Sequence, residues 1–188
     1  DPALMDRLHR GDLTAFERIY RDYEKVAYTL ALRLTGQVDN AHEVLQDAML
    51  KAWEHAAQYR GDAPFWAWLR RLVVNEALMR LRRERSRPSE PFEDVYIDEA
   101  SALPWQLVDA ATLDAALAQL PGTARAVLWL YHVEGYTHVE IAEQFGRTVS
   151  FSKSQLARGT QRLRDLLQPT TEAMPCLTRK STTLCRSV

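Results

Sequence analysis

The chain has 188 residues but only seven glycines and two cysteines, and it contains no long apolar run. Scarce glycine, with no segment that alternates apolar and polar residues at a period of two, argues against strands and predicts an all-α fold. No apolar stretch approaches the roughly 20 residues that cross a bilayer, so we expect no membrane insertion. Both cysteines, Cys176 and Cys185, lie near the C-terminus, which excludes a disulfide framework for the body of the chain.

The sequence also lacks the patterns that carry catalysis. It contains no Ser-His-Asp, Walker or metalloprotease motif, and its five histidines are scattered. We therefore expect a protein that is not an enzyme and uses no cofactor. The absence of a signal-peptide pattern predicts a cytoplasmic location. Cys176 and Cys185 lack the spacing of a usual zinc site, so we predict no metal centre there.

The net charge is only −1, yet charges of one sign are grouped in blocks. Residues 80–87 carry five Arg and one Glu, residues 88–111 carry six acids and no base, and residues 147–164 carry five bases and no acid. Such blocks predict two basic surfaces separated by an acidic connection. We expect one helical domain over 1–87, an acidic linker over 88–111, a second helical domain over 112–168, and a flexible tail over 169–188.

The first long helix is expected between Asp12, an N-cap residue, and Gly36, which suits a left-handed C-terminal position. Apolar residues recur along it at spacings of three and four, which predicts a face turned to the core. These residues are Phe16, Ile19, Tyr23, Val26, Leu30 and Leu34.

The next helix is predicted to begin with a capping box made by Asn40 and Glu43. Its apolar face comprises Ala41, Leu45, Ala48, Met49, Ala52, Trp53 and Ala56. Glu43, Asp47 and Glu54 share the opposite face, with Gln46 beside them. That face is either a solvated polar surface or a docking surface for a partner with basic groups.

The stretch from Tyr59 to Arg87 begins with aromatic residues and ends with arginines. Asp62 and Pro64 predict a helix start, and nothing breaks the pattern before Pro88. The residues expected to face the core are Phe65, Leu69, Leu72, Val73 and Met79, whereas a polar cationic stripe comprises Arg71, Asn75 and Arg82. The stretch is either an amphipathic core helix with a solvated basic end or a surface that grips nucleic acid.

The second domain is predicted to hold helices at 112–120, 123–133, 137–145 and 150–167. Thr137 and Glu140 form a capping box, and Gly146 lies in a short turn before a basic last helix. This order indicates a helix-turn-helix, although a plain three-helix bundle has the same pattern. The side chains that we expect to be exposed on the last helix are Lys153, Gln155, Arg158, Gln161, Arg162 and Arg164. Among them, Lys153 and Gln155 suit contacts with base edges, and Arg158 suits a base or a phosphate.

Two stretches resemble one family, the extracytoplasmic-function sigma factors of bacterial RNA polymerase. The first is similar to the family's region two, with a family pattern of D-A-E-D-L-x-Q-E, an A-W pair, F-x-x-W-L and an Asn. Its matching positions are Ala41, Gln46, Ala52, Trp53, Phe65, Trp68, Leu69 and Asn75. The second resembles region four, with L-P-x-x-x-R, E-I-A and a K-S-R-L-like helix. Its matching positions are Leu120, Pro121, Arg125, Glu140, Ile141, Ala142, Lys153, Ser154, Leu156 and Arg158.

The resemblance implies a promoter-specificity subunit whose partners are core RNA polymerase, through the β′ clamp and the β subunit, and promoter DNA. It implies clamp docking by Asn40, Glu43, Gln46, Asp47 and Glu54. It implies −10 element melting and recognition, with a flipped non-template base held, by Tyr59, Arg60, Gly61, Asp62, Ala63, Trp66, Arg71, Asn75 and Arg82. It implies −35 element recognition by Arg125, Thr137, Ser150, Phe151, Lys153, Ser154, Gln155, Arg158 and Arg162. The acidic linker would thread toward the RNA channel, and an anti-sigma factor is a further possible partner.

Several positions depart from the family pattern. Asn40 and His42 replace family acids, which predicts weaker docking charge. Ser150-Phe151-Ser152 replaces the usual G-T-V, and Gln155 replaces an Arg, so promoter specificity does not transfer from a relative. Two alternatives stay open: a stand-alone helix-turn-helix regulator that binds duplex DNA without polymerase, and a sensor protein governed by the tail.

Overall fold

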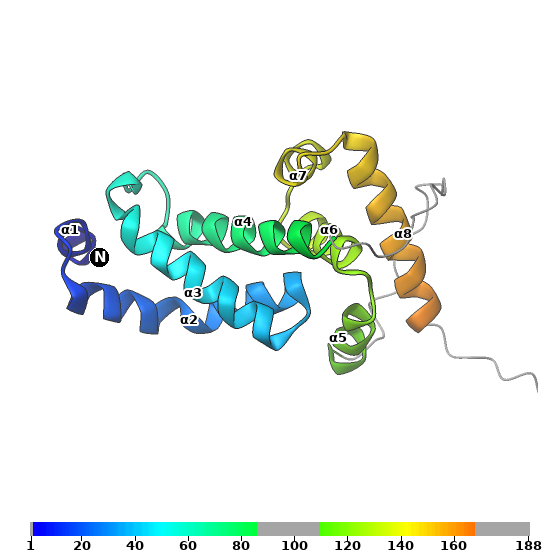
Figure 1. The fold of residues 1–188 in the computed structure, drawn as a ribbon, viewed down its shortest axis with the longest axis horizontal. Helices are drawn as coiled ribbons and strands as arrows, with labels where there is room; N and C mark the ends of the chain where they lie inside the picture. The colour runs from blue at the N-terminus through cyan, green and yellow to red at the C-terminus, as the bar shows by residue number, and fades with distance from the viewer. Residues whose placement is uncertain (1, 86–109, 168–188) are drawn as a thin grey trace, which may run out of the picture.

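The computed structural model describes residues 2–85 and 110–167, and all its regular elements there are helices, as the sequence predicts (Figure 1). The expected linker and tail, with Cys176 and Cys185, lie outside the described residues. The elements are α1 (Pro2–His9), α2 (Leu13–Thr35), α3 (Val38–Glu54), the 3-10 turn η1 (Ala56–Gln58), α4 (Phe65–Arg85), α5 (Ala110–Ala118), α6 (Gly122–His132), α7 (His138–Phe145) and α8 (Val149–Leu167).

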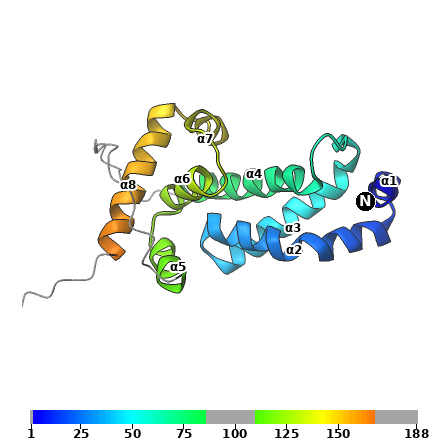
Figure 2. The same ribbon diagram turned by 180° about the vertical axis from the view of Figure 1, so that it is seen from behind.

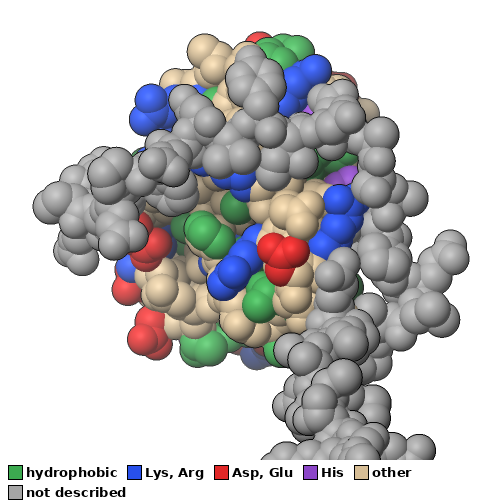
Figure 3. Space-filling view, turned by 90° about the vertical axis from the view of Figure 1, so that its right-hand side faces the viewer, with side chains coloured by type: hydrophobic (Ala, Val, Ile, Leu, Met, Phe, Trp, Pro, Cys, Tyr) green, Lys and Arg blue, Asp and Glu red, His purple; other side chains and the backbone are tan. Residues whose placement is uncertain are grey.

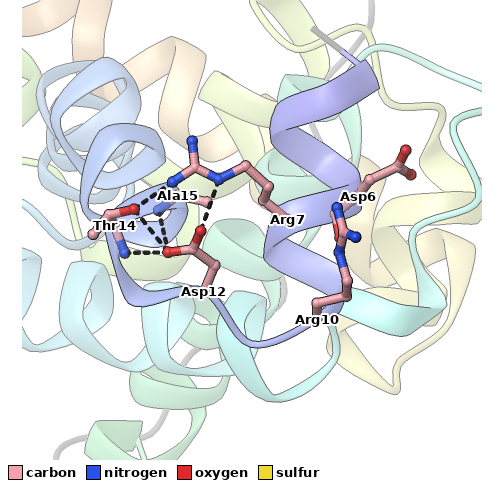
Figure 4. A network of polar contacts seen from close by, with 6 residues as sticks. All are labelled: Asp6, Arg7, Arg10, Asp12, Thr14 and Ala15. Atoms are coloured by element: carbon pink, nitrogen blue, oxygen red, sulfur yellow. Dashed lines mark hydrogen bonds and ion pairs between the residues drawn. The ribbon is translucent and has the colours of Figure 1, made fainter.

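The predicted caps of α2 are confirmed. Asp12 accepts hydrogen bonds from the backbone N–H groups of Thr14 (2.9 Å) and Ala15 (3.4 Å), and Arg7 Nε donates to its other oxygen at 2.7 Å (Figure 4). The Arg7 guanidinium and the Thr14 hydroxyl hold the pKa of the Asp12 carboxyl well below its usual range. At the other end Gly36 adopts φ +71°, the left-handed conformation that ends many helices.

The predicted Asn40–Glu43 capping box is wrong. α3 begins at Val38, its N-cap residue is Gln37, and no side chain caps it. Asn40 lies inside the helix, 7% exposed, where its amide donates to Gln37 Oε1 (2.9 Å) and Glu84 Oε1 (2.7 Å). The Asn40 side chain therefore joins α3 to α4 instead of starting a helix.

The first domain is a bundle in which α2, α3 and α4 each pack against the other two. Most residues of the predicted apolar faces are buried, including Ile19, Leu34, Met49 and Leu69. Val26 is an exception: it is 42% exposed, so the prediction that it faces the core is wrong. Burial of these side chains at about 25 cal/mol per Å² of apolar area is the main force that holds the helices together.

The second domain consists of α5 to α8, with α6 and α7 both packed against α8. The predicted capping box is confirmed, because Thr137 accepts from the Glu140 N–H while the Glu140 side chain accepts from the Thr137 N–H. Gly146 takes φ +60° in the turn between α7 and α8. These local signals fix the helix-turn-helix geometry.

The two domains pack against each other, with α6 beside α2 and α4, and α7 beside α4 (Figures 1 and 2). One continuous apolar cluster contains residues of both, such as Leu34 and Leu78 from the first domain and Val127 and Leu130 from the second. None of the described helices is both long and apolar enough to cross a membrane.

Candidate nucleic-acid and polymerase interfaces

The predicted cationic stripe lies on the surface of α4. Arg71, Asn75 and Arg82 are all exposed, at spacings that place them on one side of the helix. The opposite side is buried, with Leu69, Val73 and Leu78 in the core. One face of α4 therefore stabilises the bundle, and another presents guanidinium and amide groups to solvent; that this second face grips nucleic acid stays a prediction.

Beside the start of α4, three of the predicted loop residues, Tyr59, Arg60 and Gly61, border a hollow of about 960 Å³. Tyr59 closes the loop by donating from its hydroxyl to the Ala63 carbonyl at 2.7 Å. Arg60, Gly61, Asp62 and Ala63 are exposed. The lining comes from α1, α2, this loop and the start of α4. It includes the carboxylates Asp6 and Asp22, the second of which pairs with Arg18. Its cations, rings and glycine are Arg7, Arg18, Arg60, Tyr23, Tyr59, Phe65 and Gly61. Aromatic rings and cations on one concave surface suit an unstacked base with its phosphate.

The aromatic residues near this loop pack on one another. Trp66 is half-buried and stacks on Tyr23 with ring planes 3° apart and centroids at 6.3 Å. Tyr59 contacts Phe65 edge-on at 5.3 Å and Trp68 at 5.7 Å. Phe65 is buried, and Tyr59, Trp66 and Trp68 are half-buried against the core, so the predicted aromatic surface belongs largely to the bundle.

The predicted docking face of α3 is exposed at Glu43, Gln46, Asp47 and Glu54. Glu43 forms an ion pair with Arg80 of α4, which reduces the charge that it offers to a partner. Asn40 is buried, so its predicted place on this exposed face is wrong.

An apolar groove of about 260 Å³ lies next to Gln46. Leu50 is 54% exposed and Leu13 69% exposed at its rim, and its other lining residues are Phe16, Tyr20, Met49 and Trp53. The sequence analysis missed this groove, because an exposed Leu50 cannot be told from a core leucine by composition. A polar stripe beside an apolar groove is the usual composition of a protein-binding surface.

The end of the molecule that carries α8 shows Lys and Arg side chains at several separate places (Figure 3). Ser150, Lys153 and Arg162 are exposed, and Arg158 and Ser154 are half-buried. Phe151 packs at 5.6 Å against Phe145, so its ring supports the turn between the two helices. Thr137 lies at the N-terminus of α7, where its hydroxyl belongs to the capping box.

Two predicted DNA contacts are buried instead. Gln155 is 5% exposed, on the face of α8 that also carries the buried Ser152, Gly159 and Leu163. It is therefore not available to base edges, and the prediction of an exposed side chain is wrong. Arg125 is 6% exposed, and its guanidinium donates to the backbone carbonyl of Thr35 at the end of α2.

Further contacts across the two domains involve residues that the sequence analysis did not select. Arg70 Nη1 donates to Glu134 Oε2 at 3.0 Å, and its guanidinium lies 5.8 Å from the centre of the Tyr136 ring. Burial raises the pKa of Tyr136, although Arg70 and Arg71 oppose the shift. Arg33 forms a bidentate ion pair with Asp114. These partners are 64 and 81 positions apart, so no local spacing could have revealed them.

Within residues 2–85 and 110–167, no three His, Cys, Asp or Glu side chains gather where they could hold a metal ion.

Comparison with known proteins decides between the alternatives. The Sigma-70 region 2 family matches residues 19–87, and the Sigma-70 region 4 family matches residues 110–163. The ECF RNA polymerase sigma factor SigM of Mycobacterium tuberculosis is 38% identical over 169 residues, which cover 89% of this chain and 84% of that protein. This chain belongs to the ECF sigma factors. It therefore acts in transcription initiation and is not an enzyme.

Two further sigma factors are similar to this chain at lower identity. The RNA polymerase sigma-H factor of Pseudomonas aeruginosa is 29% identical over 184 residues, which cover 90% of this chain and 94% of that protein. Among solved structures, the sigma factor RpoE of Bartonella quintana, crystallised with the anti-sigma factor NepR, is 22% identical with a TM-score of 0.51. That alignment covers 81% of this chain and 96% of the other, and it supports the two-domain helical fold.

Proposed function

We propose that this sigma factor binds core RNA polymerase through α3, opens and reads the −10 element with α4 and its preceding loop, and reads the −35 element with α8. The observation that carries the proposal is the exposed Arg71–Asn75–Arg82 stripe on α4. A separate hollow at the start of the same helix adds aromatic rings and cations. The reaction catalysed by the polymerase needs no catalytic group from this chain.

The −10 step requires strand separation and a hold on the exposed strand. Arg71 and Arg82 supply phosphate contacts, and Asn75 can donate to and accept from a base edge. The hollow beside Tyr59, Arg60 and Gly61 is large enough to hold one flipped base. Tyr59 and its neighbouring rings offer a surface on which that base can stack. Binding of the single strand then offsets the cost of unpairing.

Polymerase docking uses the exposed face of α3 and the groove next to it. Glu43, Gln46, Asp47 and Glu54 present acidic and polar groups to basic groups of the β′ clamp. The apolar groove beside Gln46 and Leu50 accepts apolar side chains of the same partner. Acidic side chains set the orientation and the rate of association, and apolar burial supplies most of the affinity.

Recognition of the −35 element belongs to the N-terminal part of α8, with Ser150, Lys153 and Arg158 toward the major groove and Arg162 toward the backbone. Thr137, the N-cap residue of α7, and Ser154 on α8 complete the proposed set as polar groups. Gln155 and Arg125 are excluded from this set by their burial. The protein would work in the cytoplasm with the polymerase, and an anti-sigma factor that covers α3 is a candidate regulator.

Reconstitution with purified core polymerase tests the proposal. Adding the protein should produce transcripts from a defined start site on genomic fragments, and mapping that site should reveal −10 and −35 elements upstream. A Lys153→Ala variant should lose activity on the intact promoter, whereas Gln161→Ala, on the same helix, should not. A protein that neither binds core polymerase nor directs a start site would refute the proposal.

A further inference from the structure

Arg80 lies on a different side of α4 from the cationic stripe. Residues two positions apart on an α-helix are rotated by about 200°, so Arg80 and Arg82 point to nearly opposite sides. Arg82 is exposed, whereas the Arg80 side chain is only 24% exposed and contacts α3. Arg80 is therefore separated from the surface that we propose for promoter DNA, although both arginines belong to the same basic block of the sequence.

Two nitrogens of the Arg80 guanidinium contact side chains of α3. Nη2 forms the ion pair with Glu43, and Nε donates to Asn40 Oδ1 at 2.7 Å. Because the guanidinium is planar and rigid, a contact that fixes Nε also fixes the direction of the Nη atoms. The Glu43 side chain is 56% exposed, so Arg80 is held against a carboxylate that a partner can reach.

Asn40, which holds Arg80, is itself anchored by two further hydrogen bonds. Its amide nitrogen donates to Gln37 Oε1 at 2.9 Å and to Glu84 Oε1 at 2.7 Å, and the residue is buried. These bonds use both amide hydrogens, while the amide oxygen accepts from Arg80. A carboxylate at position 40 could not donate to Glu84. The amide that stands where the family pattern has an acid is therefore what positions Arg80 against Glu43.

The Arg80–Glu43 ion pair differs from an ordinary surface pair. An isolated pair is weak, because the entropy lost in ordering two long side chains offsets most of the Coulomb attraction. Here Asn40 already orders the Arg80 side chain, so less entropy is lost when Glu43 pairs with it. By contrast, Asp47 is exposed one turn further along α3 and forms no ion pair within residues 2–85 and 110–167. Two acids of one docking face thus differ in the charge that they offer.

We propose that Arg80 is an internal competitor of polymerase docking: it occupies Glu43 in the free protein, and a basic group of the polymerase has to displace it to use that carboxylate. This inference rests on the proposed docking through α3 and adds the residue that sets its strength. Arg80 lowers the affinity for a partner whose cation depends on Glu43, and affects a partner that reaches Asp47 and Glu54 much less. Arg80 is therefore a specificity-determining residue for docking and not a DNA contact.

A double-mutant cycle on the affinity for core polymerase tests the competition in the full-length protein. Arg80→Gln removes the charge, while the glutamine amide can still donate to Asn40. This variant should bind purified core polymerase about threefold more tightly at low salt, because Glu43 is released. Glu43→Gln should lower the affinity at least about three times more strongly in the Arg80→Gln background than in the wild type.

Asp47→Asn is the matched control, since it removes an exposed carboxylate of the same helix that has no ion pair with Arg80. Its loss of affinity should be the same in both backgrounds. Equal effects of Glu43→Gln in the two backgrounds would overturn the inference and leave polymerase docking intact. Weaker binding by Arg80→Gln would also overturn it, because Arg80 would then orient Glu43 for the partner. A wild type that does not bind core polymerase would refute the proposed function, and this inference with it.

Hydrogen exchange at Arg80 Nε provides a second test, which needs neither polymerase nor a destabilising variant. In nuclear magnetic resonance spectra of the wild type, the Arg80 Nε–H signal is assigned by its loss in Arg80→Gln. It should exchange with solvent at least about ten times more slowly than the Nε–H of Arg60, an exposed arginine of the loop before α4. Exchange at Arg80 as fast as at Arg60 would overturn the inference, even where core polymerase binds.

Discussion

The loss of one phosphate contact from the Arg71–Asn75–Arg82 stripe of α4 should change the salt dependence of promoter binding by an amount that can be calculated. Arg71 is exposed on α4, away from the core side of that helix, and the proposal gives it one phosphate of the opened strand. Removing one such contact lowers the steepness of log K against log salt by about 0.7 to 0.9. Between 50 and 200 mM salt, a fourfold change, the deficit of Arg71→Ala relative to the wild type should therefore shrink about threefold.

The assay is open-complex yield with core polymerase on one promoter across that salt range, measured by filter retention. Arg21→Ala is the matched control: Arg21 is also an exposed arginine, 69% accessible, but it pairs with Glu17 on α2. Its salt dependence should equal that of the wild type. Parallel salt curves for Arg71→Ala and the wild type, or an equal change in Arg21→Ala, would contradict the assignment.

Three further results are expected. Leu69→Ala should lower the free energy of unfolding by about 3 kcal/mol in denaturant titrations, because Leu69 is fully buried in the first bundle; a change below about 1 kcal/mol would contradict its core role. Asp12 has a depressed pKa when folded, so its stabilisation exists above the unfolded pKa and is lost as pH falls toward the folded one. Asp12→Asn should accordingly flatten the acid limb of the stability curve, and an unaltered limb would refute this. Lys153→Ala should reduce transcription on an intact promoter more than on one with a scrambled −35 element, and equal losses would contradict base reading by α8.

Local signals in the sequence were sufficient to predict helix ends whose capping contacts lie within a few residues of each other. The Thr137–Glu140 capping box and the Asp12 cap form as predicted, because each needs only side chains and N–H groups of one helical turn. The same reasoning failed at Asn40. There the Asn40 amide donates to Glu84 and accepts from Arg80, both on α4, and these tertiary contacts outweigh the local capping preference.

Residue chemistry alone also misplaced Gln155. The buried face of α8 runs through Ser152, Gln155, Gly159 and Leu163, at spacings of three and four. That spacing was available in the sequence, but only Leu163 is apolar, so a search for hydrophobic periodicity could not find the face. Gly159 explains why this face is buried. An added Cβ at Gly159 would lie 2.8 Å from Leu128 of α6, so α6 and α8 approach each other closely at this point.

The contacts between the two domains could not be predicted from local sequence patterns. Arg125 meets Thr35 across 90 positions, and Arg33 meets Asp114 across 81. The sequence identifies Arg125 as a cation in a family motif, which favours DNA as its partner. Only the packed structure reveals that two helix C-termini surround its guanidinium.

Permanganate reactivity of promoter thymines tests the central claim most directly, since it reports strand opening at single bases. With core polymerase and this protein together, thymines of the −10 element should become reactive, and with either component alone they should not. The Arg71→Ala variant should lower that reactivity while Arg21→Ala preserves it. Unreactive thymines in a complex that contains core polymerase, protein and a mapped promoter would contradict the account.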